Sequence, residues 1–160
     1  MYLGYQNGKI KFYTREPLNK ELYNLDKVIE TQDEYVLDGE EYVIKDEAWE
    51  QKQAQAEAER IALLYLTGAD VERGIYQAKG MDFDDILAFV MANPSQGLDV
   101  KALRIELKAN HFYRGNPYVN AVGASLGITP QQLDCFFETN DYTVLLPIEE
   151  EDENTSNTES

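Results

Sequence analysis

The sequence predicts an α+β fold, with a small antiparallel β-hairpin module, a long linking helix and a C-terminal bundle of short helices. Three observations predict it. Aromatic-rich runs flank two Xaa-Gly pairs near the N-terminus. A polar stretch rich in Ala, Gln and Glu follows them. Gly and Pro then divide the rest of the chain at short intervals. The predicted boundaries are 1–45, 46–67 and 68–146, with a disordered acidic tail over 147–160.

The β module is predicted from two hairpins. Asn7-Gly8 lies between YLGYQ and KIKFYT, and this pair suits a type I′ turn, whose two central residues both have positive φ. Asp38-Gly39 predicts a second turn of this kind between EYVL and EEYVIK. The connecting segment EPLNKELYNLDK, residues 16–27, is expected to be a loop or a short turn.

The linking helix is predicted over residues 46–67, with Asp46 as its N-cap and Glu47 near its positive end. Its first half is polar on all sides, which is typical of a spacer or of one part of an assembly. No heptad pattern lasts long enough to favour a coiled coil. The residues expected to be buried are Ile61, Leu63, Leu64 and Leu66.

The helical module is predicted from caps and apolar spacing. The expected helices span residues 70–79, 82–92, 99–112, 117–126 and 130–138.

Two segments of this module also repeat each other, because YQAKGMDFDDILAFV (76–90) aligns with GASLGITPQQLDCFF (123–137). Each copy reads as a helix, a Gly, an apolar residue, a cap and a second helix. Thr129 and Gln132 form a capping box in the second copy, with Pro130 at the first helical position. Asp82 and Asp85 are a weaker version in the first copy. We therefore expect two similar helical hairpins packed together. The other aligned pairs are Gly80 with Gly127, Met81 with Ile128, Ile86 with Leu133 and Phe89 with Phe136.

The second copy, within residues 120–137, resembles a DNA-binding helix-turn-helix. The matching positions are those that build the turn, and any tight helical corner needs them. DNA affinity comes mainly from Lys and Arg on phosphates, and no Lys or Arg follows Arg114. The second helix offers Gln131, Asp134 and Glu138 instead. We expect no nucleic-acid partner, and a helix-turn-helix regulator is the least favoured alternative.

The net charge also argues against a nucleic-acid partner. The 30 acidic and 14 basic residues give a net charge of −16 at pH 7, which repels phosphate backbones and anionic lipid. No signal peptide or membrane-spanning run is visible, so no membrane association is expected. Basic surfaces of other proteins remain compatible partners.

Candidate catalytic residues are few. His111 is the single histidine and is expected near a helix end, where it favours the negative pole. Cys135 is the single cysteine and is expected to be a buried small hydrophobe. Asp82, Asp84 and Asp85 lack the spacing of a calcium loop, and no phosphate-binding glycine motif occurs. The sequence therefore predicts no catalytic, cofactor-binding or metal-binding residues, and a protein that is not an enzyme.

Aromatic residues of the β module are the candidate binding residues. Six of the 11 tyrosines lie within the first 45 residues. Two readings stay open: the aromatic side chains pack the core of a small sheet, or they form a contact face for a protein partner. The partner-binding candidates are Tyr2, Tyr5, Phe12, Tyr13, Tyr42 and Trp49.

Residues 1–146 as a whole resemble short proteins encoded in phages and prophages of gut bacteria. The resemblance is carried by MYLGYQNGKIKFYT, EYVLDGEEYVIKDEAWEQKQAQ and LGITPQQLDCFFETNDY. It implies a gene context near tail or fibre components, and it brings no site residues. The expected function is then a tail-associated structural accessory or assembly protein, in the host cytoplasm or the virion, that binds phage proteins or a second copy of itself. The alternative is an acidic inhibitor that mimics nucleic acid.

Overall fold

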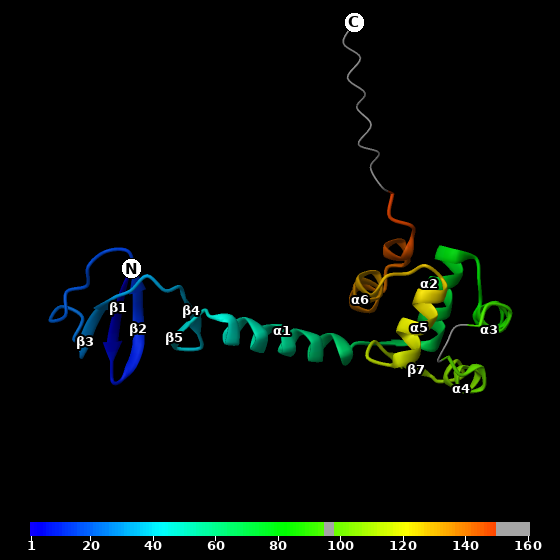
Figure 1. Cartoon of the computed structure of the whole chain (residues 1–160), viewed down its shortest axis with the longest axis horizontal. Coiled ribbons are helices and arrows are strands. Elements are labelled where there is room, and N and C mark those ends of the chain that lie inside the picture. Colours follow the sequence, from blue (N-terminus) through cyan, green and yellow to red (C-terminus); the bar gives the residue numbers. More distant parts are fainter. Residues whose placement is uncertain (95–97, 150–160) are drawn as a thin grey trace, which may run out of the picture. The chain divides into compact units, whose positions relative to one another are not determined.

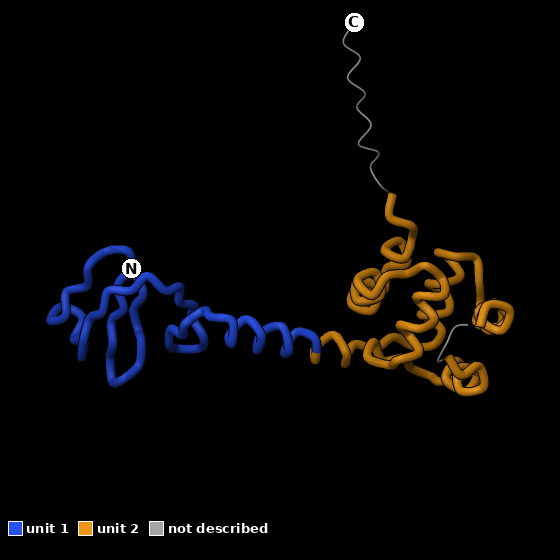
Figure 2. Tube along the Cα trace, in the orientation of Figure 1, with its two compact units in different colours: residues 1–58 blue, residues 59–160 orange. Residues whose placement is uncertain are grey.

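The computed structural model describes residues 1–94 and 98–149 of the chain. The fold is α+β, with antiparallel strands first and helices after them (Figure 1). The chain divides into two compact units, Met1–Ala58 and Glu59–Ser160 (Figure 2). Of the predicted acidic tail, residues 150–160 lie outside the described residues.

The first unit begins with a three-stranded antiparallel sheet in the order β2-β1-β3, where β1 is Tyr2–Gln6, β2 is Lys9–Thr14 and β3 is Lys27–Glu30. Asn7 and Gly8 have φ of 53° and 74°, which confirms the predicted turn. The strand β3 was not predicted, because its four residues are half charged and only Ile29 pairs with the buried Leu3.

The second hairpin joins β4, Tyr35–Asp38, to β5, Glu41–Ile44. Asp38 pairs with Glu41, so the two turn residues are Gly39 and Glu40, not Asp38 and Gly39 as the sequence predicts. Gly39 has a φ of 65° and Glu40 has no positive φ, as expected when glycine occupies the first position of a type II′ turn. The hairpin is confirmed, and its turn is shifted by one residue.

The helix α1, Glu47–Ala62, is shorter than predicted. The Asp46 carboxylate accepts a hydrogen bond from the Trp49 amide at 2.9 Å, so the predicted cap is confirmed. Residues Tyr65–Thr67 form the strand β6 and pair with β7, His111–Tyr113. The prediction that Leu63 is buried is wrong, because this side chain is 71% exposed just beyond the helix.

In its described residues the second unit contains six further elements besides β6 and β7. They are α2 (Gly68–Lys79), α3 (Phe83–Ala92), α4 (Val100–Glu106), α5 (Pro117–Ser125), α6 (Pro130–Thr139) and the 3-10 helix η1 (Tyr142–Leu145). Four predicted helices match α2, α3, α5 and α6 within two residues. The predicted helix over 99–112 is wrong in its second half, because α4 ends at Glu106 and the chain then turns into β7.

The two repeated segments do form similar helical hairpins, α2–α3 and α5–α6. Gly80 and Gly127 both have a φ of 71°, and both capping boxes are present. The correspondence fails at one aligned pair, because Phe89 is 37% exposed whereas Phe136 is 1% exposed. Phe136 is enclosed by α2, where a Cβ atom added at Gly74 would lie 2.4 Å from its ring. The repeat therefore extends to the turns and caps and not to every core position.

Candidate functional site

The predicted aromatic binding residues of the first unit lie half-buried. This holds for all six of them: Tyr2, Tyr5, Phe12, Tyr13, Tyr42 and Trp49. The Tyr13 ring packs against Tyr35 and Tyr42, with ring centroids 5.5 and 5.9 Å apart. We call these three side chains the inner tyrosine cluster. The Tyr13 hydroxyl also donates a hydrogen bond to the Asp33 carbonyl at 3.2 Å.

The pKa of Tyr35, one member of the inner tyrosine cluster, is raised above its ordinary value of 10.0, mainly by burial and further by the neighbouring Tyr5, Asp33 and Tyr13. In the same unit Phe12 packs against Tyr23 at 5.3 Å, and the Lys27 ammonium lies 4.1 Å from the centre of the Tyr5 ring. These aromatic side chains therefore contribute to the packing of their own unit.

A second group of aromatic side chains lies on the surface of the second unit. In β6 and β7 the side chains alternate, so that Leu66 and Phe112 face the core while Tyr65, His111 and Tyr113 face solvent. We call these three exposed side chains the aromatic ribbon.

Within the aromatic ribbon the side chains touch one another. The Tyr65 and Tyr113 rings are 5.8 Å apart, and those of Tyr65 and His111 are 5.6 Å apart. Tyr65 is 57% exposed and Tyr113 is 52% exposed. The exposed Leu63 precedes the ribbon in the chain.

A buried arginine fixes the strand that carries two of these residues. Arg114 follows β7 and is 6% exposed. Its Nε donates to the Asp134 carboxylate at 2.7 Å, and its two terminal nitrogens donate to the Asn120 side chain and the Pro130 carbonyl at 2.9 and 3.2 Å. One guanidinium thus connects β7 with α5 and α6, and its charge is compensated by Asp134.

The sequence interpretation missed the aromatic ribbon because it assigned Tyr65–Thr67 and the first two residues of β7 to helices. His111 was expected near a helix end, and this is wrong, since it lies in β7 and packs against Tyr65. The available signal was the short alternation in YLT and HFY, three residues each. Such a segment is too short to recognise as a strand unless its pairing partner is known.

The second helix of the helix-turn-helix-like hairpin, α6, carries two acidic side chains that pair with arginines of the same unit. Asp134 of α6 pairs with Arg114, and Glu138 accepts two hydrogen bonds from Arg60 at 3.0 and 2.9 Å. Cys135 of the same helix is exposed, so the prediction that it is a buried hydrophobe is wrong. It lies on the solvent side of α6, whereas its neighbours Phe136 and Phe137 are buried.

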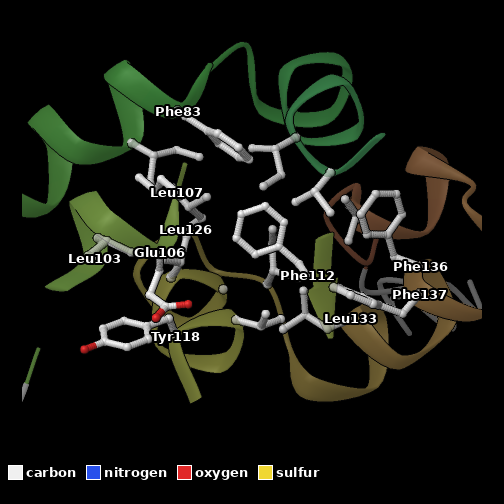
Figure 3. A pocket seen from close by; sticks show the side chains of 18 residues that line it. Phe83, Leu103, Glu106, Leu107, Phe112, Tyr118, Leu126, Leu133, Phe136 and Phe137 are labelled. Carbon is white, nitrogen blue, oxygen red and sulfur yellow. The ribbon is translucent and has the colours of Figure 1, made fainter. Parts of the chain in front are cut away.

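The elements of the second unit enclose a cavity of ≈ 50 Å³, which is shown in Figure 3. Its walls come from α2 to α6 together with β7 and η1, and they are almost entirely apolar, with Phe112 labelled near the centre of the view. Glu106 is the one carboxylate among the described side chains of the wall. Its carboxylate accepts a hydrogen bond from the Asn116 side chain at 2.9 Å.

The described residues contain neither a metal cluster nor a helix that could span a membrane. Over 1–94 and 98–149, no group of three or more His, Cys, Asp or Glu side chains is arranged to hold a metal ion. No helix in the same part of the chain combines the length and the apolar character that a bilayer crossing requires. The chain as a whole matches no family model, no curated protein and no solved structure.

Proposed function

We propose that this protein is a non-enzymatic adaptor that binds another protein through the aromatic ribbon of its second unit. The observation that carries the proposal is the pair Tyr65 and Tyr113, each more than half exposed and in contact on a short two-stranded ribbon. Tyrosine is enriched at protein interfaces because it offers a large apolar ring and a polar tip at low entropic cost.

The anchoring of β7 to the neighbouring helices also favours a binding role for the aromatic ribbon. The buried Arg114 directly follows Tyr113 of β7 and bonds to residues of α5 and α6, so the end of this strand is anchored to two helices. A surface that is ordered before binding loses less conformational entropy when a partner docks. The net charge of −16 favours a partner with a basic surface.

The biological setting that we propose is the assembly of a phage tail, with the protein in the host cytoplasm or carried into the virion. Support for this setting is the resemblance of residues 1–146 to short phage and prophage proteins found near tail or fibre genes. An adaptor that joins components of a tail or fibre needs binding surfaces and no catalytic group.

The experiment is a tagged pull-down from the infected or lysogenic host, read by mass spectrometry at low and moderate salt. The test variant replaces Tyr65 and Tyr113 together by Ala. The control variant is Tyr76→Ala, because Tyr76 is 60% exposed on α2 and lies outside the ribbon. We expect the wild type and the control to capture the same phage tail or fibre protein, and the double variant to lose it.

The salt dependence of partner capture distinguishes the adaptor from the main alternative, an acidic inhibitor. An aromatic interface should persist at moderate salt, whereas a complex formed mainly by charge should weaken steeply. Salt-sensitive recovery of a host nuclease or polymerase subunit, unaffected by the double substitution, would replace the adaptor by an acidic inhibitor.

A further inference from the structure

An open groove crosses the surface of the second unit at the start of α2. It encloses about 340 Å³ and is lined by Thr67, Gly68, Glu72, Phe83, Leu107 and Asn110, with two alanines. Its size falls within the range of small-molecule sites in proteins, roughly 300–1,000 Å³. The lining is mixed, with the Phe83 ring and several methyl groups beside one amide and one carboxylate group.

The groove and the apolar cavity share part of their walls. Phe83 and Leu107 line both of them, and no other residue does. Figure 3 shows both side chains among those around the cavity, with Phe83 coming from α3. The Phe83 ring rests edge-on against Phe112, at 5.7 Å between centroids. Phe83 and Leu107 therefore lie where the groove and the cavity adjoin.

The cavity is suited to a short aliphatic group. One water-sized group needs roughly 10–15 Å³ of such space, so ≈ 50 Å³ holds about three or four carbon atoms. Apart from Glu106 and Tyr118 the wall offers no polar side chain, and an apolar cavity of this kind stays dry and binds apolar matter.

The charge at the groove comes from Glu72. This half-buried carboxylate has no hydrogen bond or ion pair within the described part of the chain. Two of the first amides of α2 are already occupied, because Gly68 donates to the Asn110 carbonyl and Asp70 donates to the Thr67 hydroxyl. The groove therefore offers a negative charge to a ligand, and the nearby helix start offers few free donors to an anion.

We propose that the groove and the cavity together bind a small amphipathic amine. Its ammonium pairs with Glu72, and its short branched aliphatic end passes Phe83 and Leu107 into the cavity. This ligand site is independent of the protein-binding role proposed for the aromatic ribbon, which lies on other side chains.

The test is a titration of the full-length protein, labelled at its methyl groups and observed by NMR. The probes are isoamylamine, isocaproate and isoamyl alcohol, which share one aliphatic end and differ in the charge of the head group. We expect saturable shifts with the amine at methyl groups of Leu107, Val71 and Leu103, and affinity at least tenfold weaker for the carboxylate. Equal affinity for the amine and the carboxylate, or no saturable shift with the amine, would overturn the proposal.

Two variants locate the two ends of the ligand. Glu72→Gln should weaken amine binding about tenfold, while Glu50→Gln, on the exposed part of α1, should leave it unchanged. Val119→Ile adds a methyl group to the cavity wall and should weaken binding several-fold because it fills the same space. Unchanged affinity in Glu72→Gln would contradict the ion pair, and unchanged affinity in Val119→Ile would contradict entry into the cavity.

Discussion

The inner tyrosine cluster and the aromatic ribbon contain the same kind of side chain in opposite surroundings. Tyr13 is half-buried between Tyr35 and Tyr42, and its hydroxyl is bonded to the backbone of its own unit. Tyr65 lies on a two-stranded ribbon, touches only its immediate aromatic neighbours among the rings, and is 57% exposed. The first group packs within its own unit, and the second group is exposed to solvent. The following predictions test this difference, in decreasing order of their expected effect on stability.

The largest effect is expected for the arginine beneath the ribbon. Arg114→Ala leaves Asp134 without its ion-pair partner and removes two further hydrogen bonds. Because Arg114 is 6% exposed and its substitution removes three hydrogen bonds of a charged group, we expect the free energy of unfolding of the second unit to fall by about 3 kcal/mol. Urea unfolding followed by far-UV circular dichroism measures this. Arg73→Ala is the matched control, since its pair with Asp70 is on the surface and should contribute less than about 1 kcal/mol.

The next effect is expected in the inner tyrosine cluster. Tyr13→Ala removes a half-buried ring and should lower the free energy of unfolding of the first unit by about 2 kcal/mol. Tyr13→Phe keeps the ring and loses only the hydrogen bond to Asp33, so about 1 kcal/mol is expected. Trp49 is the single tryptophan and lies in the first unit, so its fluorescence reports this transition. If Tyr13→Ala left the transition unchanged, the cluster would not be part of the core.

A smaller, pH-dependent effect is expected for Tyr35. Its pKa is raised in the folded protein, mainly by burial, so the folded state holds the phenolic proton more tightly than the unfolded state. The contribution to stability is fully present below the ordinary pKa of 10.0 and is lost as the pH rises through the higher folded value. Unfolding midpoints measured on both sides of pH 10.0 should therefore fall more steeply in the wild type than in Tyr35→Phe. Parallel profiles for the two proteins would count against an enclosed Tyr35.

The smallest effect on stability is expected for the ribbon itself. Tyr65→Ala and Tyr113→Ala together should change the free energy of unfolding by less than about 1 kcal/mol, because both rings remain largely in contact with water in the folded state. The same substitutions should abolish capture of the protein partner. A large loss of stability would instead mean that the ribbon serves the packing of its own unit.

The two helical hairpins show how far a sequence repeat predicts structure. Turn and cap positions follow from local chemistry, so Gly80 and Gly127 adopt the same φ and both capping boxes form. Phe89 and Phe136 align equally well, yet one is exposed and the other is enclosed. The difference depends on Gly74, which lets α2 approach the Phe136 ring closely.

The candidate site was less predictable than the fold. The sequence indicated the tyrosine-rich β module as the binding region, and it placed β6 and the first two residues of β7 in predicted helices. Tyr65 and Tyr113 are 48 positions apart in numbering and meet only because β6 and β7 pair across the whole span of α2, α3 and α4. A pairing of that range has no signature in either three-residue strand.

The fold class, the two hairpins, the start of α1 and the caps of the later helices could all be predicted from the sequence, because each depends on neighbouring residues in the chain. The end of α1, the burial of individual tyrosines, the orientation of Cys135 and His111 and the lining of the groove at Glu72 could not be predicted in this way. These features depend on contacts between distant segments, and the free energy of such contacts outweighs local helical preference at short segments such as 65–67 and 111–113.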